Sequence, residues 1–114
     1  MFKKKKGKKI PGPFVYILKD MFKSDAFKEL TNASRMAYLL LRAQCREVEQ
    51  DEVKCPYSTA QEYMKTNTYS RSIKQLIKLG FIEKSQQGGL YRKVNVYKFS
   101  KRWRDYHPPQ YLTM

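Results

Sequence analysis

The sequence changes its hydrophobic period at Gly80, and this change constrains the fold more than any other feature. Before Gly80, apolar residues recur at the steps of three and four that line one face of an α-helix, namely Tyr69, Ile73, Leu76 and Ile77. After it come two runs rich in β-branched and aromatic residues, FIEKSQQ and LYRKVNVYKFS, which are typical of strands. Gly80 itself suits the C-terminal cap of a helix. We therefore expect a helix over residues 67–79, followed directly by a β-hairpin.

The dipeptide Gly88-Gly89 separates the two strand-like runs. Glycine readily adopts the positive φ that the central residues of a tight hairpin turn need. The sequence therefore predicts a tight turn at these two glycines.

A shorter helix is expected just before residue 67. Thr59 followed three residues later by Glu62 is a capping-box pattern, which predicts a helix over residues 59–64. Lys65, Thr66 and Asn67 then form a turn. Two helices joined by so short a turn have the spacing of a helix-turn-helix.

The longest helix is expected over residues 32–48, with Thr31 or Asn32 as its N-cap. Arg35, Arg42 and Arg46 fall outside its apolar stripe, which consists of Ala33, Met36, Ala37, Leu40, Leu41, Cys45 and Val48. The stripe indicates a helix that lies in the core.

Shorter elements are expected around this helix, and the complete pattern is α+β. Residues 13–18 have the composition of a short strand that could join the sheet. Residues 20–30 offer one or two helical turns anchored by Phe22, Phe27 and Leu30. Residues 53–55, just before a proline, suit a very short strand.

The charge of the chain is large and unevenly placed. The 114 residues include 24 Lys and Arg against 10 Asp and Glu, a net charge of +14. Residues 1–9 carry +6, residues 10–52 carry −1 and residues 53–104 carry +10. This excess is greater than solubility requires, so it indicates a polyanionic partner, with nucleic acid first among the candidates.

The helix expected over residues 67–79 has a second face without any acidic residue. That face consists of Asn67, Ser70, Arg71, Lys74 and Lys78. Its cationic and hydroxyl groups can bind phosphates, and Arg71 or Asn67 can reach base edges in a major groove. A solvated helix face is the simpler interpretation. The preceding helix, the following hairpin and the local charge excess favour a nucleic-acid role instead.

The run YSTAQEYMKTNTYSRSIKQLIKLGFIEK, followed by GGLYRKVNVYKFS and Trp103, resembles the winged helix-turn-helix domains of phage and plasmid replication initiators and of bacterial transcriptional regulators. Thr68 and Tyr69 take the place of the usual Thr-aliphatic pair, and the rest of the pattern is filled by Ile73, Leu76, Gly80, Phe81 and Ile82. The resemblance covers residues 13–104. It implies a core helix, a helix-turn-helix and a C-terminal β-hairpin, the wing.

The resemblance also implies which residues contact DNA. On the second helix these are Thr66, Asn67, Ser70, Arg71 and Lys74, and Lys78 on the same helical face completes the predicted set. In the wing they are Lys84, Gln86, Gln87, Arg92 and Lys93. The alternative for the wing is a hairpin whose charged edges merely block aggregation. The chain departs from the family pattern at Tyr69, which is bulkier than the usual Val or Ile, and at Lys65, where a Ser or Thr N-cap is common.

Both ends of the chain are expected to lie outside the packed domain. Residues 1–12 form a basic arm with too little apolar content to order itself, and Lys3, Lys4, Lys5, Lys6, Lys8 and Lys9 could follow a DNA backbone. A solubilising terminus is the alternative. Residues 105–114 form a tail in which prolines stop regular structure.

Several classes of function have little support in the sequence. Cys45 and Cys55 are isolated and His107 is the sole histidine, so we expect no metal site. No apolar run approaches the length of a membrane span, and we expect a cytoplasmic protein with reduced thiols. No pair of nucleophile and base is readable, so we expect neither an enzyme nor a cofactor or small-molecule substrate.

The sequence thus predicts double-stranded DNA binding, in replication initiation or transcriptional control, with a homodimer left open. Two alternatives also remain open. One is an RNA- or ribosome-associated module, because the same charge suits both polymers. The other is a protein-interaction module for an acidic partner.

Overall fold

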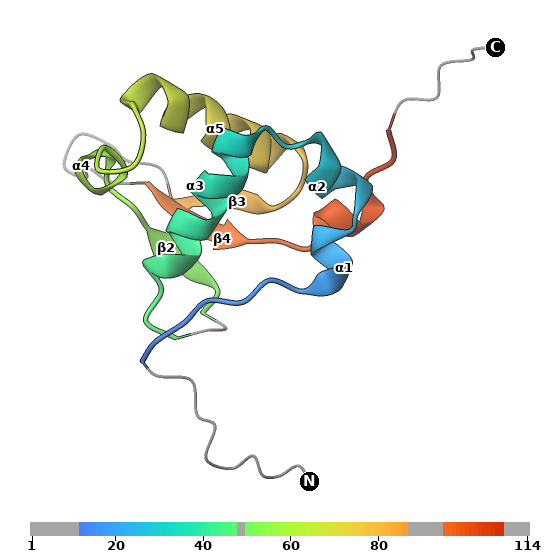
Figure 1. Cartoon of the computed structure of the whole chain (residues 1–114), viewed down its shortest axis with the longest axis horizontal. Helices are drawn as coiled ribbons and strands as arrows, with labels where there is room; N and C mark the ends of the chain where they lie inside the picture. Colours follow the sequence, from blue (N-terminus) through green and yellow to red (C-terminus); the bar gives the residue numbers. More distant parts are fainter. Residues whose placement is uncertain (1–11, 48–49, 87–94, 109–114) are drawn as a thin grey trace, which may run out of the picture.

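The computed structural model describes residues 12–47, 50–86 and 95–108, which form an α+β domain (Figure 1). The α+β class predicted from the sequence is confirmed. The elements in chain order are α1 (Lys19–Phe22), α2 (Asp25–Glu29), α3 (Asn32–Ala43), β2 (Glu52–Lys54), α4 (Tyr57–Ala60), α5 (Thr66–Lys78), β3 (Ile82–Gln86), β4 (Val96–Phe99) and the 3₁₀ helix η1 (Arg102–Asp105).

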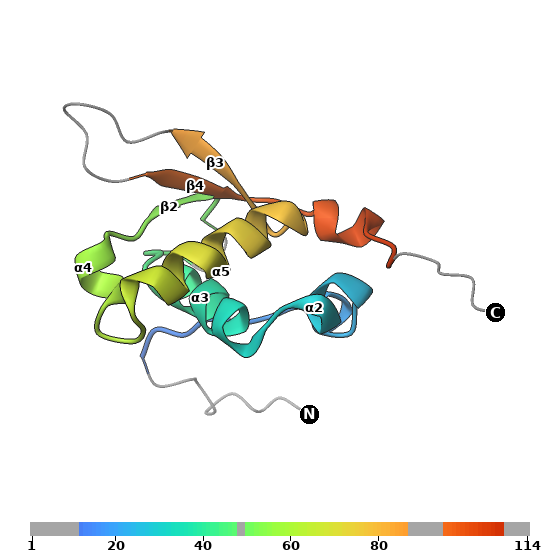
Figure 2. The same cartoon turned by 90° about the horizontal axis from the view of Figure 1, so that it is seen from above.

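The described strands form an antiparallel sheet in the order β2-β4-β3. The last strand of the chain is therefore the central one, and it pairs Tyr97 with Val53 on one side and with Lys84 on the other. Figure 2 shows the sheet as one layer, with α3 and α5 beneath it. The hydrophobic core lies between these two layers.

Phe81 is a central side chain of this core, with 1% of its surface exposed. Its ring lies edge-on to those of Phe27 and Tyr38, at centroid distances of 6.2 and 6.0 Å, and stacks on Trp103 at 6.3 Å. Phe81 thereby connects α2, α3 and η1 to the start of β3. Trp103, which belongs to the sequence pattern of the predicted winged helix-turn-helix, is buried.

Gly80 ends α5 and redirects the chain into β3. Its φ is +89°, and the N–H groups of Gly80 and Phe81 donate to the carbonyls of Ile77 and Leu76 at 3.2 and 2.9 Å. These two bonds form a Schellman motif, so the predicted C-terminal cap is confirmed. A Cβ on Gly80 would lie 2.7 Å from backbone atoms of Arg102 and Trp103.

The N-terminal third differs from the sequence prediction in two respects. Residues 13–18 have no strand assignment, and the described sheet does not include them. Four of these six residues, Phe14, Val15, Tyr16 and Leu18, are 40–46% exposed, so no face of the segment is buried as a strand in the sheet would be. The two short helices are confirmed as α1 and α2, but Met21 is buried in α1 and the expected anchor Phe22 is exposed.

The helix α3 begins as predicted and ends early. Thr31 is its N-cap and accepts a hydrogen bond from the Ser34 N–H at 3.1 Å. The helix stops at Ala43 rather than at residue 48. The chain turns beyond it because the side-chain oxygen of Gln50 accepts hydrogen bonds from the N–H groups of residues 46 and 47, at 2.9 and 3.4 Å. The prediction that this is the longest helix is therefore wrong, because α3 has 12 residues and α5 has 13.

The buried face of α3 is rotated from the predicted stripe. Ala37, Leu40 and Leu41 are buried as expected, whereas the predicted Met36 is 46% exposed. The buried face takes in Ser34 and Tyr38 instead. Val48, the last member of the predicted stripe, lies outside the described residues.

The capping box predicted at Thr59 and Glu62 is wrong. Pro56 is the N-cap of α4, which begins at Tyr57, and Thr59 lies inside the helix. Proline favours such a start because its fixed φ suits the entry to a helix. The predicted turn is displaced too: α5 begins at Thr66, so Thr66 and Asn67 belong to its first turn.

The structure describes the pairing of β3 with β4 but not the predicted turn at Gly88-Gly89. Ile82 pairs with Phe99 and Gln86 with Val96, with an irregularity between Lys84 and Gln86. Val96 and Tyr97 are both buried in the observed register. The two strands that pair are those predicted for the hairpin. Residues 87–94, which include both glycines, lie outside the described part of the chain.

Gly80→Ala is expected to destabilise the domain by roughly 2–4 kcal/mol and to lower Tm by roughly 10 °C or more. The cost combines the positive φ with the overlap of the new Cβ and the backbone of η1. Gly12→Ala is the matched control, because Gly12 has a φ of +87° but no atom within 4 Å of the added Cβ. It should cost about 1 kcal/mol or less. Thermal unfolding that finds the two variants equally stable would contradict this role for Gly80.

Candidate nucleic-acid interface

Helix α5 separates its side chains into a buried and an exposed face. Tyr69, Ser72, Ile73 and Leu76 are each 6% exposed or less. The predicted outer face is brought together on the other side: Asn67, Arg71, Lys74 and Lys78 are exposed, and Ser70 is half-buried among them. Thr66 is exposed in the first turn, and none of the 13 residues of α5 is acidic.

Gln75 determines how α5 is rotated about its axis. Its side-chain oxygen accepts hydrogen bonds from the Thr31 N–H at 3.0 Å and from the Ser34 hydroxyl, and its amide donates to the Glu29 carbonyl at 3.2 Å. These bonds attach α5 to the junction of α2 and α3. Sequence reasoning missed this role, although a polar residue at the border of an apolar stripe is a signal for it. The direction of the outer face follows from this attachment.

Tyr69 anchors the N-terminal half of α5. Its hydroxyl donates to the Cys55 carbonyl at 3.3 Å, and its ring meets that of Tyr57 edge-on at a centroid distance of 5.5 Å. A Val or Ile at this position could make neither contact. The bulk of Tyr69 therefore has a structural purpose, which is to join α5 to the segment between β2 and α4.

The start of α5 adds a cation that sequence reasoning left out of the site. Lys65 is the N-cap, gives no side-chain hydrogen bond to the helix and is exposed. The Thr66 hydroxyl accepts from the Gln61 amide at 3.0 Å, which holds the preceding turn against the helix. The partial positive charge of a helix N-terminus attracts anions, so Lys65 reinforces the charge of the outer face.

The structure describes two of the residues predicted for the wing and none of the lysines predicted for the basic arm. Lys84 is exposed on β3, and Gln86 ends that strand opposite Val96. The structure therefore describes these two positions but not the tip between them and β4. The other predicted contacts lie outside the described residues: Gln87, Arg92, Lys93, Lys3, Lys4, Lys5 and Lys6.

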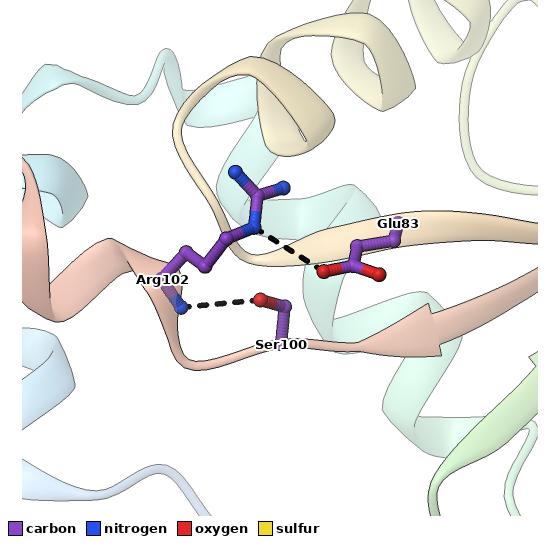
Figure 3. Close-up of polar contacts among 3 residues, drawn as sticks. All are labelled: Glu83, Ser100 and Arg102. Atoms are coloured by element: carbon purple, nitrogen blue, oxygen red, sulfur yellow. Dashed lines mark hydrogen bonds and ion pairs between the residues drawn. The ribbon is translucent and has the colours of Figure 1, made fainter.

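The acid nearest in sequence to the C-terminal end of α5 is neutralised within the domain. Glu83 on β3 forms an ion pair with Arg102, with 3.2 Å between the carboxylate oxygen and Nε, and the Arg102 N–H donates to the Ser100 hydroxyl at 3.1 Å (Figure 3). Both charged side chains are about half exposed, so the pair contributes roughly 1 kcal/mol or less. The carboxylate of Glu83 is thus paired within the domain.

The described residues contain no group of three or more His, Cys, Asp or Glu placed to hold a metal ion. Cys45 and Cys55 are unpaired thiols, and burial raises the pKa of both. A raised pKa lowers the thiolate fraction and hence the reactivity. Within the same residues, no helix has the length and apolar character needed to cross a membrane.

Comparison of the chain with models of protein families, with curated proteins and with solved structures finds no match. The interpretation of α5 therefore depends on its own side chains and on their geometry.

Alkaline pH is expected to destabilise the domain through its buried tyrosines. Burial raises the pKa of Tyr38, Tyr69 and Tyr97 in the folded protein. Above pH about 10, the unfolded chain loses phenolic protons that the folded chain retains, so the free energy of unfolding falls as pH rises. Tyr69→Phe should make this fall less steep and cost about 1 kcal/mol at neutral pH through the lost hydrogen bond. An unchanged slope in urea titrations at several alkaline pH values would refute the role of Tyr69.

Proposed function

We propose that this chain binds double-stranded DNA by laying the outer face of α5 in the major groove. One observation carries the proposal: α5 exposes an acid-free face with Arg71, Lys74 and Lys78, while its opposite face is buried and its rotation is held by Gln75. A cationic face held at a fixed rotation suits recognition of a regular polyanion.

The arrangement of the elements supports the proposal. A core helix α3 precedes two helices joined by a short turn, and β3 and β4 follow as a hairpin paired with β2. This arrangement is compatible with a winged helix-turn-helix, in which α5 is the recognition helix and the β3–β4 connection is the wing. By that resemblance, the domain acts in replication initiation or transcriptional control.

The outer face of α5 offers groups for two kinds of contact. The Arg71 guanidinium can donate two parallel hydrogen bonds to guanine, and the Asn67 amide can form a bidentate pair with adenine. Lys74, Lys78 and the hydroxyls of Thr66 and Ser70 suit phosphates. At 13 residues α5 is roughly 20 Å long, and a helix of ordinary diameter fits the major groove.

The wing and the arm extend the proposed interface. Exposed Lys84 lies on the strand that leads to the β3–β4 connection, and Gln86, Gln87, Arg92 and Lys93 are proposed to contact flanking phosphates or a minor groove. Lys3, Lys4, Lys5 and Lys6 add charge without sequence information, because a flexible lysine has no fixed geometry.

Charge reversal on α5 tests the proposal against general electrostatics. Lys74→Glu is expected to weaken binding to a short duplex at least tenfold, or about 1.4 kcal/mol. Lys19→Glu, which makes the same change at an exposed position of α1, should weaken it no more than about threefold. Fluorescence anisotropy with labelled duplex, single strand and structured RNA makes the measurement. Equal losses in the two variants, or tighter binding of RNA than of duplex, would contradict the proposal.

Arg71→Lys separates base reading from phosphate binding. The variant keeps the charge but loses the planar fork, so binding to random duplex should change little while a selected site loses about 1–3 kcal/mol of discrimination. Lys78→Ala should weaken all duplexes alike. Competition binding with a selected and a random duplex checks both variants. If Arg71→Lys discriminates as well as the wild type, Arg71 does not read bases.

A further inference from the structure

A hollow of about 610 Å³ lies among α1, α2 and α3, apart from α5. Both views place α1 and α2 at the end of the molecule opposite α4 (Figures 1 and 2). The volume is in the range of ordinary ligand pockets. Its lining consists of Ile17, Phe22, Lys23, Phe27, Lys28, Arg35 and Leu39. None of these residues belongs to α5 or to the sheet, so the hollow is distinct from the candidate nucleic-acid interface.

The interior of the hollow is apolar and partly open to solvent. The Phe22 ring is tilted against that of Phe27 at a centroid distance of 5.2 Å, but 60% of Phe22 is exposed. Ile17 and Leu39 line the same space and are only half-buried. Met36, one helical turn before Leu39, is exposed as well. A partner that covered these side chains would gain their burial.

Every charged residue that lines the hollow is a cation. Arg35 is held in place, because its guanidinium lies 5.3 Å from the centroid of the Phe27 ring and donates to the carbonyls of Phe27 and Lys28. Lys23, at the end of α1, and Lys28, in the last turn of α2, are exposed. Among the described residues, the one ion pair is that of Arg102 with Glu83, so these three cations have no carboxylate partner there.

The acids of the same segment do not line the hollow. Asp20, Asp25 and Glu29 lie on α1 and α2 but are not among the lining residues. The rim is therefore cationic even though this part of the chain has almost no net charge. An apolar interior with a cationic rim complements a ligand that is apolar at its centre and anionic at its edges.

We propose that this hollow docks an acidic amphipathic segment of a partner protein. An aromatic or aliphatic side chain of that segment enters the hollow between Phe22 and Leu39, and its flanking carboxylates meet Lys23, Lys28 and Arg35. An amphipathic helix laid in a groove is a common form of such recognition. A second copy of this chain fits less well, because it would bring another cationic rim and a net charge of +14 against the first.

A designed peptide provides the probe. It is a labelled amphipathic helix with Leu and Phe on one face and Glu along the edges, and its binding is followed by fluorescence anisotropy at low salt. Wild-type protein should bind it at least tenfold more tightly than the same peptide with Gln for Glu, or with Ala for Leu and Phe. Failure to bind the acidic peptide, or equal affinity for the Gln peptide, would overturn the proposal.

Variants then locate the bound peptide. Phe22→Ser and the double variant Lys23→Glu/Lys28→Glu should each weaken binding at least tenfold. The matched controls are Tyr63→Ser, whose wild-type side chain is also 60% exposed but lies just beyond α4, and Lys74→Glu/Lys78→Glu on α5. Thermal unfolding checks that every variant is folded. If either control weakens the peptide as much as its counterpart in the hollow, the peptide binds elsewhere and the proposal is wrong.

Two further readouts separate the remaining outcomes. Sedimentation of the wild-type protein should give a monomer; a dimer dissociated by Phe22→Ser would identify a second copy as the occupant and refute the acidic partner. Phe22→Ser should bind duplex DNA as the wild type does. Peptide docking and DNA binding can therefore succeed or fail independently.

Discussion

The lack of space at Gly80 is the constraint on which the arrangement of this domain depends. The residue ends α5, directs the chain into β3 and receives the Trp103 N–H on its carbonyl at 3.2 Å. A side chain there would push η1 away and remove Trp103 from the ring of Phe81, against which it stacks. One backbone position thus connects the helical layer, the sheet and the C-terminal 3₁₀ helix, and the exposed face of α5 is oriented as a result.

The position of α5 then follows from contacts at three points along its length. Tyr69 attaches its first half to the end of β2, Gln75 attaches its second half to the start of α3, and Gly80 fixes its end. Because the buried face is held in this way, Arg71 and Lys74 lie exposed on the opposite side of the helix. A surface made of long flexible side chains has a defined direction only because the helix beneath it cannot rotate.

The sequence predicted the helices well where the hydrophobic periodicity and the cap residues agreed. Thr31 and Gly80 were both identified from local chemistry, and the outer face of α5 followed from helical spacing. The errors arose where tertiary contacts decided the outcome. Pro56 moved the start of α4, Gln50 ended α3 early, and the contact of Tyr38 with Phe81 brought Tyr38 into the buried face of α3. Local sequence patterns do not show which residues meet in the folded chain, so they cannot predict such contacts.

The most direct test of DNA binding through α5 is a map of the backbone amides that change when duplex DNA is added. Titration of isotope-labelled protein with a short duplex, followed by amide chemical shifts, measures this without mutation. Binding through α5 predicts that the largest changes fall on Thr66, Asn67, Ser70, Arg71 and Lys74, and that α1 and α2 change little. Changes concentrated on α1 and α2, with α5 unaffected, would contradict it.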